Sequence, residues 1–306
     1  MKRATLIYNP VAGRNPAQRE RQIQEAGEVL RSLGLDVTLA RTTGPGSATE
    51  LARAAVASGD DILFACGGDG TINEVINGMQ PSNVSLAILP GGTANILAKE
   101  LGLPHHPVRA ARELPRLKPR RIALGCAKKS SVSAATPAEN LQRYFISVAG
   151  VGFDAYVIHK LTFDLKMSLG VAAYILEGVR QVANYSFPAL VSKTDGRETR
   201  VTFALIQRTS RYAGWFRTAP QQRLTNSTFC LSLYKSSNRL RYLAYALSIL
   251  LQRRLREVEQ IETHSVSFAS LEPEAPVYYE LDGELAGTLP VTFEIVPDAL
   301  TLLMPT

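Results

Sequence analysis

The feature that most constrains this chain is an apolar run that ends in a glycine-rich turn. Phe64–Cys66 is apolar, and Gly67, Gly68, Asp69, Gly70 and Thr71 follow it directly. Glycine lets the backbone approach a ligand closely and adopt φ values that other residues avoid. Thr71 can open a helix, whose first N–H groups and dipole attract an anion. The pattern predicts a strand, a phosphate-handling turn and a helix.

The spacing of this turn excludes two common nucleotide loops. A Walker loop needs a Lys after its last Gly, and a Rossmann fingerprint needs a Gly where Asn73 stands. A carboxylate inside a phosphate loop is repelled by phosphate unless a metal or a proton-transfer role compensates. Asp69 is therefore a candidate for chemistry. The alternative is an ordinary Gly/Asp turn between a strand and a helix.

Two further apolar runs end in loops of a related kind. Val84–Leu89 leads into Pro90–Asn95, and Thr5–Tyr8 leads into a loop with Asn9 and Gly13. In an open parallel sheet, ligands bind outside the carboxyl ends of the strands. We therefore expect these loops to face one cleft.

These residues resemble the diacylglycerol kinase catalytic family, which includes sphingosine kinases and bacterial lipid kinases, with NAD kinase as a more distant relative. The resemblance covers nearly the whole chain. Its signatures here are Asn9–Pro10, Gly67–Gly78, Leu89–Asn95, Gly150–Asp154 and Leu281–Glu284.

The resemblance implies ATP-dependent phosphorylation of a lipid hydroxyl, with Glu284 as the general base. One carboxylate near the acceptor hydroxyl can take its proton. Asp69 would share that catalytic task or hold Mg²⁺ through water. Thr42 would contact the nucleotide or serve as an ordinary cap in a turn. The residues expected to bind the cofactor are Asn9, Thr42, Gly67, Gly68, Gly70, Thr71, Asn73, Glu74, Gly91, Gly92, Thr93 and Asn95.

Two departures from the family pattern remove carboxylates. Ile96 stands where many bacterial relatives have Asp, and Thr225–Ser227 replaces the usual Asp-Gly step after Ala219–Pro220. No protein ligand for Mg²⁺ is therefore assigned. Magnesium is still expected with ATP, because the phosphates supply oxygen ligands and Mg²⁺ commonly keeps several waters.

The length of 306 residues, 45% of them hydrophobic, indicates two domains. Residues 1–124 alternate apolar runs at 35–40 and 61–65 with helical patterns at 18–33 and 47–58, which predicts an α/β nucleotide-binding domain with a parallel sheet. Gly34 and Gly59 are expected to end those helices.

Residues 125–306 show strand-like alternation instead, which predicts an all-β sandwich on the lipid acceptor side. The expected strands include residues 144–148, 201–206, 229–234 and 291–296, and the last strand can pack back on the first domain. Residues 127–140 are expected to form a flexible hairpin loop. The family also implies a cleft between the domains, closed by Asp282–Glu284, in which Asp282 can simply form a turn.

Composition narrows the setting in which the protein works. Cys66, Cys126 and Cys230 are too few and scattered for a disulfide framework or a zinc site, which points to a reducing compartment. His105 and His106 lack further ligands at metal spacing and are expected to be linker residues. No signal peptide is predicted at the N-terminus. We expect a cytoplasmic protein at the inner face of the membrane.

The net charge of +7 favours an anionic membrane surface. In Arg239–Arg256, arginines flank a ten-residue, mostly apolar run, which is shorter than the roughly 20 residues a spanning helix needs. This segment is expected to be an interfacial, buried or partner-binding helix. Leu161–Val182 is a second candidate, although its helical spacing favours core packing. No nucleic-acid reader motif is present.

The sequence hypothesis is a lipid kinase of phospholipid biosynthesis, acting on a diacylglycerol-like or sphingoid lipid. One alternative is a soluble small-molecule kinase of the NAD kinase type. A second is a catalytically weak nucleotide- or lipid-binding protein, which the loss of carboxylates at Ile96 and Thr225–Ser227 would suit. An exposed sheet edge in the second domain could pair two chains into a homodimer.

Overall fold

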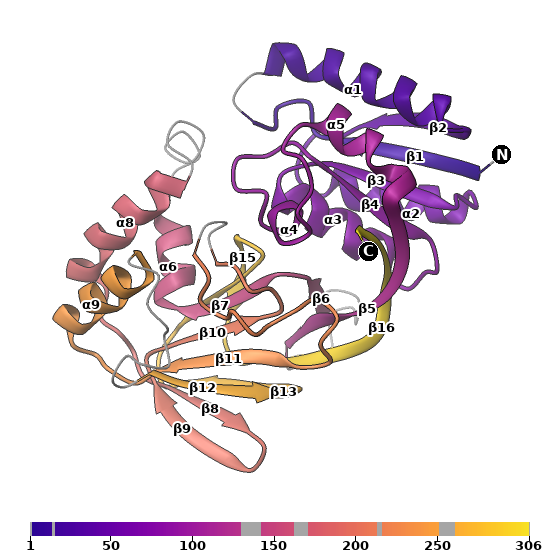
Figure 1. Ribbon diagram of the computed structural model, residues 1–306. Helices are drawn as coiled ribbons and strands as arrows, with labels where there is room; N and C mark the ends of the chain where they lie inside the picture. Colours follow the sequence, from indigo (N-terminus) through magenta and orange to yellow (C-terminus); the bar gives the residue numbers. More distant parts are fainter. Residues whose placement is uncertain are drawn as a thin grey trace. The chain divides into compact units, whose positions relative to one another are not determined.

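The structure is a computed structural model that describes residues 2–13, 16–129, 142–161, 171–212, 216–250 and 261–305 (Figure 1). The chain forms two compact units. One comprises Met1–Ala123 together with Pro297–Thr306, and the other comprises Leu124–Val296.

The first unit is built on a parallel sheet with strand order β2, β1, β3, β4. The C-terminal part of β16 (Val291–Pro305) extends this sheet, because Thr301 pairs with Ser85 in parallel. Every residue of β3 is buried, as expected for a strand with both faces covered. The strands are β1 (Lys2–Tyr8), β2 (Leu35–Arg41), β3 (Ile62–Gly67) and β4 (Ser85–Pro90).

The helices of this unit are α1 (Pro16–Ser32), α2 (Ser47–Ala57), α3 (Asp69–Met79), α4 (Ile96–Glu100) and α5 (Pro107–Arg112), followed by the 3₁₀ turn η1 (Leu114–Arg116). Gly34 and Gly59 follow α1 and α2 at φ of +88° and +77°, which confirms their predicted place after the helices. Helix α3 begins at Asp69, with Gly68 as its N-cap, and not at Thr71. The turn is therefore two residues shorter than expected.

The second unit is an antiparallel sandwich, as predicted. One sheet has the order β12, β11, β10, β7, β14, β15. In the other, the N-terminal part of β16 pairs with β13, followed by β8 and β9. Phe145 stacks on Phe229 at 5.7 Å and meets Phe293 edge-on at 6.0 Å, which joins the two sheets. The strand β5 (Leu117–Lys129) begins in the first unit and continues into the second from Leu124. The other strands of the second unit are β6 (Gln142–Phe145), β7 (Val148–Gly152), β8 (Leu190–Thr194), β9 (Arg197–Val201), β10 (Phe203–Gln207), β11 (Phe229–Tyr234), β12 (Ile261–Val266), β13 (Phe268–Pro273), β14 (Tyr278–Leu281) and β15 (Glu284–Thr288).

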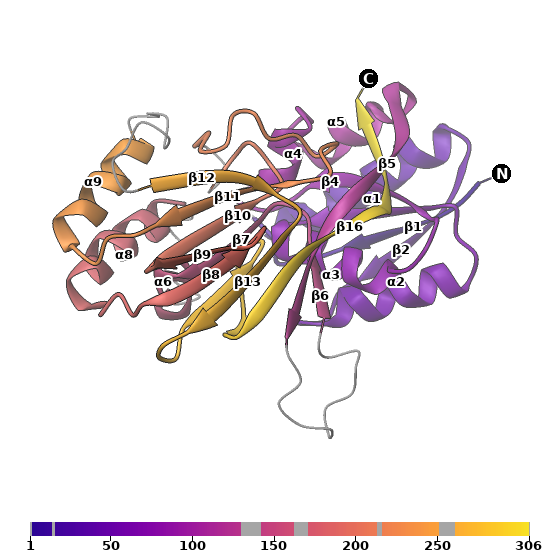
Figure 2. The same ribbon diagram turned by 90° about the horizontal axis from the view of Figure 1, so that it is seen from below.

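Among the described residues, the helices of this unit are α6 (Phe153–Lys160), α8 (Val171–Asn184) and α9 (Arg239–Leu250). They lie together at one end of the strands in both views (Figure 2). The two helical candidates from the sequence therefore form α8 and α9, but their residues 162–170 and 251–256 lie outside the described part of the chain. Most of the expected hairpin loop, residues 130–140, also lies outside it.

Two strands expected to be continuous are interrupted. The run 144–148 breaks between β6 and β7, because the carboxylate of Asp282 takes the backbone N–H groups of Ile146 and Ser147. The run 201–206 breaks at Thr202, whose N–H and hydroxyl both bond to the carbonyl of Tyr234. In both cases, a residue distant in the sequence accepts hydrogen bonds from the residues at the break.

Helix α3 contacts α2 at Gly78, the last residue of the long signature. A Cβ at this position would lie 2.2 Å from the carbonyl oxygen of Thr49 and 2.9 Å from the Cβ of Ala52. The glycine is thus required by the close approach of two helices. By contrast, a Cβ at Gly178 in α8 would meet nothing within 4 Å.

We predict that Gly78→Ala lowers the free energy of unfolding by roughly 1–3 kcal/mol, because overpacking forces the two helices apart. The control Gly178→Ala should leave this free energy unchanged or raise it by about 0.5–1 kcal/mol, since Ala favours a helix over Gly. Urea unfolding followed by circular dichroism measures both. Equal stability of the two variants would contradict the packing account.

Candidate functional site

Two glycine pairs interlock at the carboxyl ends of β3 and β4. The N–H of Gly91 donates to the carbonyl of Gly67 at 2.9 Å. A Cβ on Gly92 would lie 2.4 Å from the Cα of Gly68, and a Cβ on Gly67 would lie 2.6 Å from Thr71. The two loops therefore pack backbone against backbone, which residues with side chains would prevent.

Polar side chains fasten the second of these loops. The side chain of Asn95, at φ 49°, accepts the N–H of Gly92 at 2.8 Å and donates to its carbonyl at 2.7 Å. The carboxylate of Asp69 accepts the N–H of Ile96 at 2.8 Å. Ile96 thus contributes its backbone to the loop while its side chain is buried. Asp69 has a structural bond in addition to the chemistry proposed for it.

The loop after β1 joins the other two, as the sequence predicted. The amide of Asn9 lies 3.5 Å from the hydroxyl of Thr71. Gly13 has φ +82°, and a Cβ there would lie 2.8 Å from the carbonyl oxygen of Gly91. These contacts bring the three predicted loops together at one edge of the sheet.

Arg19 is a functional candidate that the sequence reasoning missed. Its buried guanidinium donates to the carbonyl of Ala12 at 3.0 Å and to that of Gly91 at 2.6 Å. It therefore places a positive charge directly behind the glycine loops. No motif marks this arginine, because it is one of several charged residues in α1. Its neighbour Cys66 is inert, since burial raises the pKa of its thiol to about 12.

Other predicted cofactor residues are bonded to the protein. The carboxylate of Glu74 accepts the N–H groups of Gly46 and Ala48 at 2.8 and 3.0 Å, and so caps α2. Asn73 is fully buried, and its side-chain oxygen accepts from Asn77 at 3.2 Å. Thr42 is buried and donates its N–H to Tyr8, whereas Thr93 is exposed. Contact of these residues with a nucleotide stays a prediction.

In the second unit, Asp282 and Gly283 form the turn between β14 and β15, at φ 51° and 87°. Both are in the left-handed region, as in a two-residue hairpin turn. The turn role considered for Asp282 is confirmed, and its buried carboxylate does more. It accepts the N–H groups of Ile146, Ser147 and Val148 at 3.0, 2.8 and 3.0 Å, which locks the hairpin against the start of β7.

Glu284 directly follows this turn as the first residue of β15. Its carboxylate pairs with the guanidinium of Arg143 at 2.7 Å, and the Glu284 side chain is 37% exposed. Glu284 is therefore accessible to a substrate while its orientation is held by the turn and by Arg143. No sequence motif marks Arg143, which lies 141 positions away from Glu284 along the chain.

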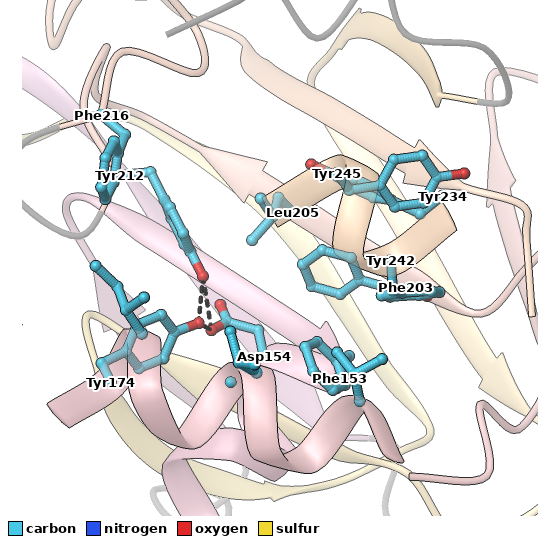
Figure 3. Close-up of a pocket in the computed structure, with 14 residues that line it drawn as sticks. Phe153, Asp154, Tyr174, Phe203, Leu205, Tyr212, Phe216, Tyr234, Tyr242 and Tyr245 are labelled. Carbon is cyan, nitrogen blue, oxygen red and sulfur yellow. Dashed lines mark hydrogen bonds between the residues drawn. The ribbon is translucent and has the colours of Figure 1, made fainter. Parts of the chain in front are cut away.

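The second unit also contains a cavity of about 110 Å³ lined largely by aromatic side chains. Figure 3 shows Phe153, Tyr212 and Phe216 around it, with the carboxylate of Asp154 next to the hydroxyl of Tyr212. Tyr174 and Tyr212 both donate their hydroxyls to the same oxygen of Asp154, Tyr212 at 2.8 Å. The cavity is thus apolar on its walls and acidic at one point. Asp154 ends the signature Gly150–Asp154, but the walls could not be read from the sequence.

The comparisons with known proteins agree with both units. Residues 3–127 match the diacylglycerol kinase catalytic domain, and residues 147–304 match the YegS C-terminal NAD kinase beta sandwich-like domain. The chain belongs to the diacylglycerol kinase family of lipid kinases. A diacylglycerol kinase of Bacillus subtilis is 27% identical over 100% of this chain and 97% of its own length. One from Staphylococcus aureus (strain MRSA252) is 26% identical over 95% and 89%.

The fold of this lipid kinase is also found among solved structures. A diacylglycerol kinase structure from Bacillus anthracis strain Sterne matches with a TM-score of 0.75 at 22% identity, covering 99% of this chain and 97% of that one. In the described part of the lipid kinase, no helix is long and apolar enough to cross a membrane.

The loop at Thr225–Ser227, where this lipid kinase lacks the Asp-Gly step of the family pattern, packs against a buried arginine. Arg208 is fully buried, and its guanidinium donates to the carbonyls of Leu224 and Asn226 at 2.8 and 2.5 Å, and to Thr228 at 3.2 Å. Burial lowers the pKa of Arg208 to about 10, so the group stays charged at neutral pH. Oxygens that would attract Mg²⁺ already face a positive charge, so these residues do not fit a metal ion.

We predict that Arg208→Met lowers the free energy of unfolding by roughly 3–5 kcal/mol, because several buried carbonyls lose their charged partner. The control Arg223→Met removes an exposed guanidinium that bonds two carbonyls of the same loop. It should change the free energy of unfolding by less than about 0.5 kcal/mol. Urea unfolding compares them. Adding Mg²⁺ without nucleotide should leave the melting temperature of the wild type unchanged, and an increase would contradict this account.

Proposed function

We propose that this lipid kinase transfers the γ-phosphate of ATP to a hydroxyl of a diacylglycerol-like or sphingoid lipid. The aromatic cavity of the second unit is the observation that carries the proposal. Burial of an apolar chain against such walls is favourable, whereas a polar dinucleotide would lose its hydration there without compensation. This distinction favours a lipid over the NAD kinase alternative.

The interlocked glycine loops are the proposed binding site for the ATP phosphates. The first-turn N–H groups of α3 and its dipole attract negative charge. The guanidinium of Arg19 adds a positive charge behind the loops. Phosphoryl transfer depends mainly on such positioning and charge stabilisation. Mg²⁺ would be carried by the phosphate oxygens and water, and would neutralise charge on the phosphates when bound.

Glu284 is the proposed general base that takes the proton of the acceptor hydroxyl. It is accessible, it is ion-paired with Arg143 at 2.7 Å, and its backbone is fixed by the turn that precedes it. The presence of both Glu284 and Asp69 favours a catalyst over a weak nucleotide- or lipid-binding protein.

We predict that Glu284→Gln lowers kcat by about 10²–10⁴-fold, the usual contribution of a general base. Asp69→Asn should keep the bond to Ile96 and the fold, yet lose activity as well. Glu272→Gln is the control, because Glu272 is also an exposed strand glutamate paired with a cation. Transfer of label from ATP with Mg²⁺ to vesicle lipids and to NAD measures all three variants.

The outcomes of this assay separate the candidate functions. Label in one lipid, lost in Glu284→Gln, supports the kinase and identifies its acceptor. Label in NAD alone would favour the soluble kinase. ATP binding without transfer to any acceptor would favour the binding protein.

Helices α8 and α9 are the proposed contact with the inner face of the cytoplasmic membrane. Leu176 and Val179 on α8, and Leu240 and Leu243 on α9, are exposed. Val179 also lines the cavity, so this surface would deliver a lipid to its mouth. The same helices carry exposed arginines, Arg180 and Arg239, which suit anionic headgroups. On α9, Tyr242 and Tyr245 face the cavity, so one side of this helix is buried.

We predict that Leu176→Glu combined with Leu240→Glu weakens binding to anionic phospholipid vesicles at least about tenfold, since each leucine loses 1.5–3 kcal/mol of burial in the bilayer. Leu33→Glu, at an exposed leucine of the first unit, should bind like the wild type. Co-sedimentation with vesicles measures the binding. Equal sedimentation of the double variant and the control would remove these helices as the docking surface.

A further inference from the structure

We propose that Glu280 is a positioning residue that shares a proton with Asp154 at the aromatic cavity and holds the turn that precedes Glu284. The inference rests on the role proposed for Glu284. Glu280 belongs to none of the signatures that mark the chain as a lipid kinase, and nothing in its sequence neighbourhood singles it out.

The first part of the argument is the position of the Glu280 carboxyl. The residue lies in β14 and is 1% exposed. Its Oε2 accepts the N–H of Gly283 at 2.7 Å. Gly283 directly precedes Glu284, so this bond fixes the backbone from which the proposed base extends.

The other oxygen of Glu280 faces Asp154. Gly150 of β7 pairs with Glu280 in the sheet. A Cβ on Gly150 would lie 2.2 Å from Oδ2 of Asp154 and 2.7 Å from Oε1 of Glu280. Both carboxyl oxygens therefore approach one point from two sides, and glycine leaves the space that they share. This contact explains why the signature begins with a glycine.

The two carboxyls share one proton. Oε1 of Glu280 is buried, and no N–H or O–H of the described residues donates to it. Two buried carboxyls in contact cannot both ionise. Asp154 accepts the hydroxyls of Tyr174 and Tyr212, which stabilise its charge, whereas in the described part of the chain Glu280 accepts a single donor, the Gly283 N–H. The proton therefore stays on Glu280, which donates a hydrogen bond to the carboxylate of Asp154.

The electrostatic surroundings agree with this assignment. Burial is the main cause that raises the pKa of Glu280 well above its usual value, and the nearby charge of Asp154 raises it further. The groups that face Glu280 are Asp154 from α6, Asp282 from its own hairpin, and Tyr174 from α8 beyond Asp154. None of them is a cation.

The consequence is a dependence on pH with a defined sign. The folded state holds the proton more tightly than the unfolded chain, so its stabilising effect is present at low pH and is lost as pH rises through the folded pKa. Above that pKa, two anions would repel each other between the cavity floor and the turn. Both the stability of the fold and the placement of Glu284 should then decline.

Glu280→Gln and Glu280→Leu test this role. A glutamine can donate its amide N–H to Asp154 and accept from Gly283, as the protonated acid does. We expect Glu280→Gln to keep kcat at neutral pH within about twofold and to lack the alkaline decline attributable to Glu280. Glu280→Leu breaks both bonds and should lower kcat at least about tenfold, with the KM for ATP unchanged, as for loss of a bond that matters in the transition state.

The pH dependence of unfolding, measured without substrates, separates this inference from the proposed function. Wild-type stability should fall at alkaline pH relative to Glu280→Gln, whichever acceptor the enzyme uses. Glu272→Gln should follow the wild type. Identical pH profiles of stability for wild type and Glu280→Gln would overturn the shared proton. A loss of kcat in Glu280→Gln as large as in Glu280→Leu would overturn the positioning role.

Discussion

The first unit depends on a contact between two stretches of bare backbone. Gly67 and Gly68 at the end of β3 meet Gly91 and Gly92 at the end of β4 at distances that leave no room for a Cβ. This approach aligns the starts of α3 and α4 and allows Asp69 to bond across to Ile96. The glycines thus hold the two loops together, because side chains at these positions would keep the backbones apart.

The second unit is organised by buried charges that bind backbone. Asp282 collects three N–H groups, and Arg208 bonds three carbonyls. Burial of a charged group without partners would cost free energy. A buried charge that bonds several backbone groups instead fixes the conformation of that segment through strong hydrogen bonds. Asp282 acts on the break between β6 and β7 and on the first residue of β7, and Arg208 acts on the loop that contains Leu224, Asn226 and Thr228. The hairpin with Glu284 and the loop at Thr225–Ser227 owe their shapes to them.

Much of the fold could be predicted, because its signals are local. The parallel sheet, the places where α1 and α2 end and the β-rich second half follow from apolar periodicity and from glycines after helices. The strand breaks at Ile146 and Thr202 could not be predicted. Each depends on a partner far along the chain, Asp282 or Tyr234, that competes for the bonding groups at the break.

The sequence by itself determined the family, the glycine loops and the turn that precedes Glu284, since each is a contiguous motif whose backbone conformation is set locally. Only the tertiary structure decided what Glu74, Arg19 and Glu280 do. Glu74 caps a neighbouring helix, Arg19 stands behind the loops, and Glu280 meets Asp154. The physical reason is that hydrogen bonds and carboxyl pairs depend on distances in space, and a single sequence records only distances along the chain.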